Sequence, residues 1–173
     1  ADIGFAVDPD ADRLAIVNNF GQPLGEEYTL VLAAEGFLKE VGKGQDIVTN
    51  LSTTIALEKM AEKNDSKVQR TAVGEINVVK RMIEIGSNIG GEGNGGVILK
   101  EAHLGRDSLV GVAMILNRLS QDADKSISEI HNTLPQFNIV KDKVQLDHID
   151  ESYLLHGPTP PPPNQLPGEG EGR

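Results

Sequence analysis

Short apolar runs alternate with helical hydrophobic periods along most of this chain. The apolar runs typical of strands occupy residues 3–7, 14–17, 46–50, 67–70, 88–91 and 96–99. Hydrophobic residues recur with a helical period over residues 26–41, 55–64, 76–85, 107–119 and 127–134, and Ser52-Thr53-Thr54 can cap the second of these helices. This alternation predicts an α/β fold, with helices layered against a mostly parallel, mixed sheet in an α/β/α arrangement.

Three polar loops follow predicted strands. They cover residues 8–13, 71–75 and 90–96. Ligands of open α/β sheets bind outside the carboxyl ends of the strands. We therefore expect these loops to lie at the ligand-binding edge.

The first loop carries aspartates at alternate positions, Asp8, Asp10 and Asp12. In an extended segment such carboxylates project to one side and repel one another unless a cation neutralises them. Oxygen ligands without His or Cys favour Mg²⁺ or Ca²⁺, and three of them leave positions for water and a phosphate oxygen. We predict that these aspartates bind Mg²⁺, with a solvated acidic turn as the alternative.

An EF-hand loop begins with the same spacing of aspartates. Here Arg13 stands at the sixth position, where that loop needs Gly, and Asn19 at the twelfth, where it needs Glu, so an EF-hand is excluded. Arg13 can hold a phosphate beside the metal, as cations do in phosphoryl-transfer sites, or pair internally with Asp12.

The glycine-rich segment 90–96 places five glycines around Glu92 and Asn94. Its backbone can approach a ligand closely, while the carboxylate and the amide bind hydroxyls. No Lys-Ser/Thr pair follows, so this is not a Walker A loop. We predict sugar binding through Glu92 and Asn94, with a plain hairpin turn as the alternative.

The loop at residues 71–75 joins a strand to a helix and ends in Gly74 and Glu75. The N–H groups at a helix start favour an anion, which Glu75 would repel. A substrate hydroxyl is therefore the better ligand here, unless Glu75 only caps the helix. His103 and Arg106, near a later helix start, are candidates for a substrate phosphate or for structural roles.

Charge and composition restrict the classes of binding partner and the cellular location that we expect for the protein. A formal charge of −10 disfavours nucleic acid, although a small phosphorylated ligand stays compatible. The absence of Cys fits a cytoplasmic protein, and the longest apolar stretch, residues 30–34, is far shorter than the ~20 residues of a membrane span. The chain starts without Met or a signal peptide, so we expect a fragment.

The C-terminal segment differs in composition. Residues 156–173 hold six of the nine prolines and a Gly-Glu repeat. Such a composition cannot bury a core, so we expect a linker or a disordered tail. A non-native appendage and an SH3-type proline ligand are the alternatives.

The motifs taken together resemble the α-D-phosphohexomutase family over about residues 2–146. They are Asp-Pro-Asp-Ala-Asp-Arg at 8–13, Val-Gly at 73–74, Gly-Glu-x-Asn-Gly at 91–95, Lys100, and Gly-Arg-Asp at 105–107. The resemblance implies a four-domain enzyme in which a phosphoserine on domain 1 exchanges its phosphoryl group with a hexose phosphate. Domain 2 would supply the metal loop, domain 3 the sugar loop and domain 4 a phosphate clamp.

The resemblance also implies domain boundaries. Residues 1–22 would end domain 2, 23–136 would form domain 3, 137–146 a linker strand, and 147–173 a Pro/Gly-rich tail. The phosphoserine loop and the clamp have no counterpart in this sequence, so the chain alone should lack mutase turnover. The missing domains of the same polypeptide would complete the enzyme.

The same resemblance assigns roles to the loops. The three aspartates would bind Mg²⁺, Arg13 would lie beside the phosphoserine, and Gly74, Glu75, Glu92 and Asn94 would contact the sugar. The family often has Ser where Asn94 stands and His where Gly96 stands, which leaves the hexose open, with a preference for a glucosamine- or mannose-type substrate.

Two alternatives from other functional classes stay open. One is a non-catalytic acidic α/β module that binds a divalent cation. The other is a phosphotransferase with an aspartyl nucleophile, because Asp-x-Asp also occurs where one Asp attacks phosphorus.

Overall fold

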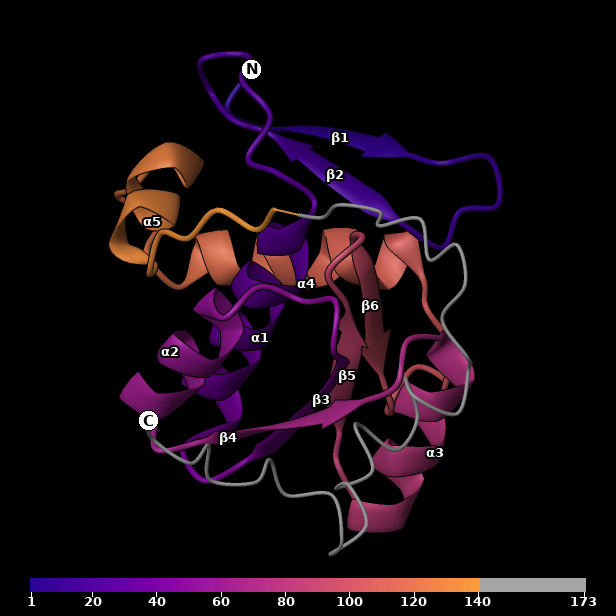
Figure 1. Cartoon of the computed structure of the whole chain (residues 1–173). Helices are drawn as coiled ribbons and strands as arrows, with labels where there is room; N and C mark the ends of the chain where they lie inside the picture. The colour runs from indigo at the N-terminus through magenta and orange to yellow at the C-terminus, as the bar shows by residue number, and fades with distance from the viewer. Residues whose placement is uncertain (141–173) are drawn as a thin grey trace, which may run out of the picture. The chain divides into compact units, whose positions relative to one another are not determined.

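A four-stranded mixed sheet is the centre of the computed structural model, which describes residues 1–140 (Figure 1). Its strands are β3 (Asp46–Asn50), β4 (Lys67–Thr71), β5 (Ile89–Glu92) and β6 (Gly96–Leu99), in the order β4-β3-β5-β6. β3 is parallel to β4 and β5, whereas β6 is antiparallel to β5. The predicted mixed, mostly parallel sheet is therefore confirmed.

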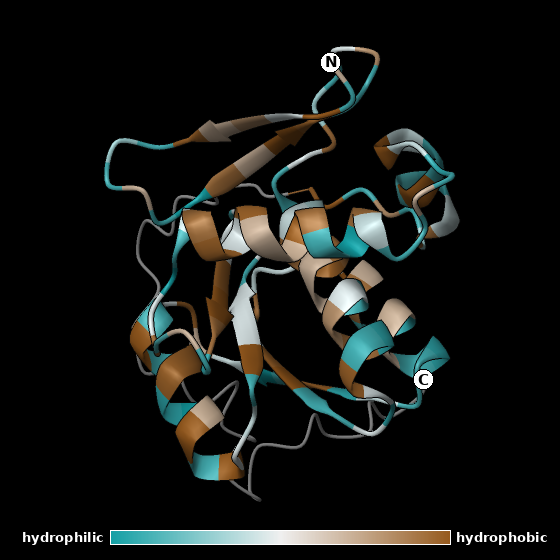
Figure 2. Ribbon diagram, turned by 180° about the vertical axis from the view of Figure 1, so that it is seen from behind, coloured by the Kyte–Doolittle hydropathy of each residue, from teal (hydrophilic) through white to brown (hydrophobic). Residues whose placement is uncertain are grey.

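Helices cover both faces of this sheet. They are α1 (Glu27–Val41), α2 (Ala56–Lys63) and α4 (Ser108–Ser120) on one face, and α3 (Glu75–Ile85) on the other (Figure 1). Because neighbouring strand residues point to opposite faces, Ile47 joins the larger core with α1, whereas Val48 packs against Val78 and Met82 of α3. In Figure 2 the helices alternate between brown, hydrophobic residues and teal, hydrophilic ones, as expected of helices with one buried face. The α/β/α layering is confirmed.

A separate two-stranded sheet precedes this domain. β1 (Gly4–Val7) and β2 (Leu14–Val17) form an antiparallel hairpin whose turn is residues 8–13. Leu14 and Ile16 are buried in the larger core, and the Thr29 hydroxyl of α1 donates to the Leu14 carbonyl at 2.8 Å. The hairpin is thus fixed against the domain at the base of the acidic turn.

Local signals explain most element boundaries. Asp107, predicted to open a helix, is the N-cap of α4 and accepts hydrogen bonds from the Leu109 and Val110 amides. The short α5 (Ile127–Thr133) begins with a capping box made by Ser126 and Glu129.

The helix predicted to follow the cap residues Ser52-Thr53-Thr54 begins at Ala56, and the Thr54 hydroxyl accepts the Ala56 amide at 3.2 Å. One boundary prediction differs from the structure. No strand forms over residues 137–140, and the rest of the strand predicted to 146, like the predicted tail, lies outside the described residues. None of the helices within residues 1–140 is long and apolar enough to cross a membrane.

A buried ionic cluster joins α1 to α4. The Arg118 side chain, only 3% exposed, donates from Nε to Glu35 at 2.5 Å and from Nη1 to Asp122 at 2.7 Å. The Lys39 ammonium donates to the same Asp122 oxygen at 2.7 Å. Gly36 permits this close approach, since a Cβ there would lie 2.9 Å from the Arg118 Cβ.

This cluster predicts an acid-dependent loss of stability. Hydrogen bonds from Lys39 and then Arg118 outweigh partial burial and lower the pKa of Asp122 from 3.8 to about 2. The stabilisation contributed by Asp122 is therefore fully present above the pKa of this aspartate in the unfolded chain, 3.8, and is lost as the pH falls through about 2. Asp122→Asn should lower the free energy of unfolding at pH 6, and the difference from wild type should shrink from pH 4 to pH 2, measured by urea denaturation.

Asp65→Asn serves as the control, because Asp65 pairs with Lys43 at an exposed position where ion pairs contribute little. A wild-type-like urea midpoint for Asp122→Asn at pH 6 would contradict the stabilising role of the cluster.

Candidate functional site

The acidic segment 8–13 is a tight turn, whereas an extended segment was expected from the alternate spacing of its aspartates. The Ala11 amide donates to the Asp8 carbonyl at 3.1 Å, and Ala11 adopts a left-handed φ of 60°. The turn nevertheless gathers the predicted metal ligands, because one carboxylate oxygen each from Asp8, Asp10 and Asp12 lies within 4.8 Å of the other two.

Asp8 and Arg13 hold each other inside this turn. Asp8 Oδ1 accepts the amides of Asp12 at 3.2 Å and Arg13 at 3.1 Å, while Oδ2 accepts Arg13 Nε at 2.6 Å. Partial burial would raise the pKa of Asp8, but the Arg13 amide and guanidinium outweigh it and lower the pKa to about 2. Arg13 Nε is also 3.5 Å from Asp12 Oδ1, so the internal ion pair weighed from the sequence exists, with Asp8 as its nearer member.

Asp12 offers an oxygen that fits a cation. Its Oδ1 is buried and has no hydrogen-bond partner within residues 1–140. Burial raises the pKa of Asp12, Arg106 opposes this, and the charges of Asp10 and Asp8 add to it. Apart from the 3.5 Å ion pair with Arg13 Nε, nothing among the described residues compensates this buried carboxylate oxygen, and two further carboxylates lie beside it, so a cation there is favourable. The donor set therefore suits a hard divalent cation such as Mg²⁺ or Ca²⁺.

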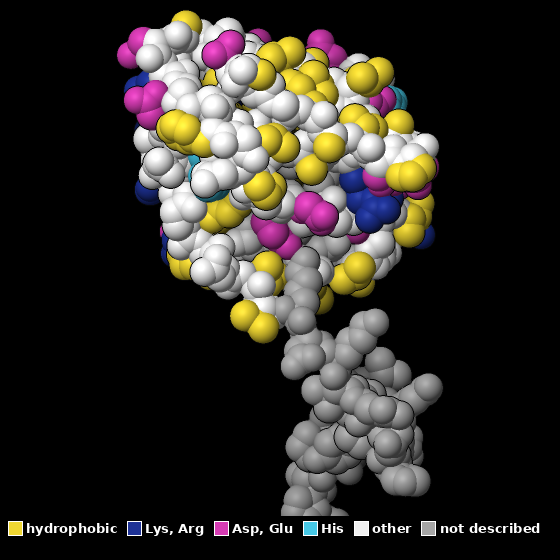
Figure 3. Space-filling view, turned by 90° about the horizontal axis from the view of Figure 1, so that it is seen from above, with side chains coloured by type: hydrophobic (Ala, Val, Ile, Leu, Met, Phe, Trp, Pro, Cys, Tyr) yellow, Lys and Arg dark blue, Asp and Glu magenta, His cyan; other side chains and the backbone are white. Residues whose placement is uncertain are grey.

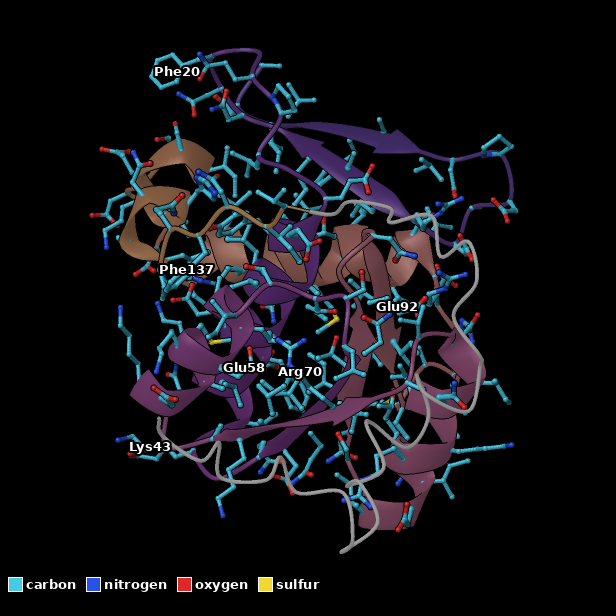
Figure 4. The ribbon with its side chains drawn as sticks, viewed as in Figure 1. Phe20, Lys43, Glu58, Arg70, Glu92 and Phe137 are labelled. Atoms are coloured by element: carbon cyan, nitrogen blue, oxygen red, sulfur yellow. The ribbon has the colours of Figure 1, made fainter. Side chains whose placement is uncertain are left out.

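Glu92 ends β5 and is 4% exposed (Figure 4). Its Oε1 accepts Asn50 Nδ2 at 2.6 Å and the Gly74 amide at 3.2 Å, and its Oε2 accepts Arg106 Nη1 at 2.7 Å. Since a carboxylate offers roughly four acceptor positions, these three bonds fix the group and leave about one position for a ligand hydroxyl.

The glycine-rich loop after β5 packs tightly on the hairpin. The Leu14 amide donates to the Gly95 carbonyl at 3.0 Å. A Cβ on Gly95, which has a φ of 93°, would lie 2.6 Å from the Leu14 carbonyl oxygen. At Gly93 a Cβ would lie 2.1 Å from Glu27 Oε2. Only glycines permit these close contacts of the loop with β2 at Leu14 and with α1 at Glu27.

Asn94 lines a cavity together with residues of the acidic turn. Its Oδ1 accepts the Gly96 amide at 3.2 Å, which fixes the turn. The cavity, about 310 Å³, is lined by Asn94 together with Asp8, Arg13 and Glu26. Its volume lies at the small end of the range for ligand pockets.

Gly74 and Glu75 approach from the start of α3. Gly74, with a φ of 118°, is the N-cap, and its amide points to Glu92. Glu75 Oε1 accepts the Arg106 amide at 2.8 Å, and Oε2 lies 3.3 Å from Arg106 Nε. The side chain is thus turned toward Arg106, and among the described residues it makes no N-cap hydrogen bond to its own helix.

Arg106 joins the three loops, a role that its sequence position did not establish. Its guanidinium, 16% exposed, contacts carboxylates of Asp12, Glu75 and Glu92. The only sequence signal was its place in a Gly-Arg-Asp run before a helix. His103, the other candidate, pairs with Asp107 at 3.0 Å and, within the described residues, forms no hydrogen bond or ion pair with the three loops.

A larger cavity lies elsewhere. It measures about 560 Å³ and is lined by Leu51, Ile55, Arg70 and Phe137, the last two labelled in Figure 4. Among the described residues it includes none of the predicted site residues.

The surface seen from above carries mixed charge, because Lys and Arg side chains lie beside Asp and Glu side chains there (Figure 3).

Known proteins of one family resemble this chain. Residues 25–137 match the family described as phosphoglucomutase/phosphomannomutase, alpha/beta/alpha domain III. A phosphoglucomutase/phosphomannomutase of Thermococcus kodakarensis is 37% identical over 143 residues, which are 83% of this chain and 31% of that protein. A phosphoglucosamine mutase of Phenylobacterium zucineum is 35% identical over 147 residues, which are 84% of this chain and 32% of that protein.

Solved structures agree with these relatives. A putative phosphomannomutase from Thermus thermophilus has a TM-score of 0.69 at 25% identity, over 76% of this chain and 30% of that one. A phosphoglucomutase/phosphomannomutase family protein from Burkholderia thailandensis has a TM-score of 0.69 at 31% identity, over 79% of this chain and 29% of that one. The chain spans about a third of the length of the curated relatives it matches. It belongs to the phosphoglucomutase/phosphomannomutase family and carries the α/β/α domain III of that family.

Proposed function

We propose that this chain is a portion of a phosphosugar mutase that interconverts hexose 6-phosphate and hexose 1-phosphate through a phosphoserine. The convergence of Asp12, Glu75 and Glu92 on Arg106 carries the proposal, because it joins a cation loop to buried hydroxyl acceptors. A phosphorylated sugar needs both functions, a positive charge for its phosphate and acceptors for its hydroxyls.

In this proposal Asp8, Asp10 and Asp12 bind Mg²⁺. The family is generally metal-dependent, and oxygen ligands next to a phosphate suit Mg²⁺. A bound Mg²⁺ would neutralise charge on the phosphoryl group during transfer. Arg13, about half exposed beside Asp8, would contact the phosphoserine from its remaining N–H groups.

The sugar would bind at the glycine-rich loop. Glu92 would accept one hydroxyl through its remaining acceptor position, already oriented by its other bonds. Asn94 would bind a second hydroxyl from the rim of the 310 Å³ cavity. Gly74 and Glu75 would border the sugar on the α3 side. Glucose, mannose and glucosamine phosphates are all candidate substrates, since the relatives carry names for these activities.

The remaining parts of the enzyme would come from other segments of the polypeptide. In this proposal residues 1–22 form the end of domain 2 and residues 23–136 form domain 3. The complete enzyme would be cytoplasmic. Neither a phosphoserine loop nor a phosphate clamp has a counterpart in this sequence, so the chain alone should show no turnover. An aspartyl nucleophile at Asp8 is disfavoured because Asp12 and Arg13 already bind both of its oxygens.

The metal loop predicts cation binding by the chain alone. Mg²⁺ titration followed by calorimetry should show one site, and Asp10→Asn should raise the dissociation constant at least about tenfold, ~1.4 kcal/mol, since one of three ligand charges is removed. Asp10 is the exposed member of the three, so this change perturbs folding least.

Asp65→Asn, which removes an exposed carboxylate elsewhere, should bind Mg²⁺ as wild type does. Equal affinity of Asp10→Asn and wild type would contradict the metal assignment, and a parallel Ca²⁺ titration reports which ion the loop prefers.

The sugar loop predicts a substrate effect in the complete mutase that contains this segment. Glu92→Gln should lower kcat/KM for a hexose phosphate about 10- to 100-fold, the equivalent of one hydrogen bond to a charged acceptor. Glu84→Gln on the exposed side of α3 is the matched control. An unchanged kcat/KM for folded Glu92→Gln would rule out this role.

A further inference from the structure

Arg106 holds two groups that belong to different halves of the site. Nη2 pairs with Asp12 Oδ2, and Nη1 donates to Glu92 Oε2 at 2.7 Å. The guanidinium is planar and its N–H groups have a fixed geometry, so a displacement at one carboxylate changes the contact at the other. Asp12 and Glu92 are thereby connected through one rigid group.

Asp12 is shared between this connection and the acidic turn. Its Oδ2 faces Arg106, whereas its Oδ1 belongs to the acidic turn and has no hydrogen-bond partner within the described chain. A cation bound through Oδ1 would draw charge from the carboxylate and weaken its attraction for the guanidinium. Arg106 would then interact more strongly with Glu92 and Glu75.

The surrounding backbone fixes Arg106 on both sides. Its amide donates to Glu75 Oε1 at 2.8 Å, and the next turn is fixed by the Ser108 amide, which donates to the Ala11 carbonyl at 3.1 Å. A Cβ on Gly96 would lie 2.3 Å from Arg106 Cδ, so the glycine-rich loop leaves room for this side chain in its present position only because residue 96 is Gly.

We propose that Arg106 is a positioning residue that couples cation binding at the acidic turn to the state of Glu92 at the sugar loop. The proposal rests on the proposed function for the identity of the two ligands. Because coupling free energies are reciprocal, sugar binding at Glu92 would change the cation affinity by the same factor.

The Gly74 amide is the reporter for this coupling. It donates to Glu92 Oε1 at 3.2 Å and belongs to neither the acidic turn nor Arg106. Mg²⁺ is titrated into the ¹⁵N-labelled 173-residue chain, and amide shifts are followed by NMR. In wild type the Gly74 amide should shift with the same dissociation constant as the amides of residues 10–13.

Arg106→Lys retains the charge but loses the forked geometry. In this variant the amides of the acidic turn should still respond to Mg²⁺, whereas the Gly74 shift should be largely lost. Gly96→Ala displaces the Arg106 side chain without changing any charge, so it should also lose most of the Gly74 shift. This variant replaces Arg106→Lys in the test if Arg106→Lys does not fold. Arg81→Lys, on the far part of α3, should behave as wild type.

The outcomes separate this inference from the proposed function. A wild-type response confined to the acidic turn would overturn the coupling and leave the metal site intact. An undiminished Gly74 shift in folded Arg106→Lys and Gly96→Ala would show that the cation acts through space, which also overturns it. No response at any amide of the wild-type chain would overturn both the metal site and the coupling.

Discussion

The contact of one guanidinium with three carboxylates is the interaction on which this site depends. Asp12, Glu75 and Glu92 come from three loops and would repel one another at the carboxyl edge of the sheet without Arg106. Removing one partner of a buried ion pair typically costs about 3–5 kcal/mol, because the remaining charges lose their compensation. A single cation against three anions still leaves negative charge, which favours a further cation at the acidic turn.

The fold brings these groups together by simple geometric means. β3, β4 and β5 are parallel, so their carboxyl ends lie at one edge, and Asn50, Gly74 and Glu92 follow or end these strands. The hairpin adds the acidic turn because Leu14 is buried in the larger core and pairs with Gly95. Packing of apolar residues thus determines where the charged side chains of the site lie.

Elements that depend on local signals could be predicted from the sequence. The bounds of β3, the start of α4 at its Asp107 cap and the α/β/α layering all follow from hydrophobic period, turn residues and capping. The clustering of Asp8, Asp10 and Asp12 also follows, although their turn is not extended. The role of Arg106 could not be predicted, since its partner Asp12 is 94 residues away and only the tertiary fold brings them together. The start of α2 follows from the hydroxyl residues before it, since the Thr54 hydroxyl accepts the Ala56 amide.

Anomalous diffraction from a crystal of this chain grown with Mn²⁺, a heavier stand-in for Mg²⁺, tests the cation site at the acidic turn most directly. We expect one strong peak in contact with Asp8, Asp10 and Asp12, with Arg106 still bound to Glu92. A peak elsewhere, or none at the acidic turn, would contradict a cation site at this edge of the domain.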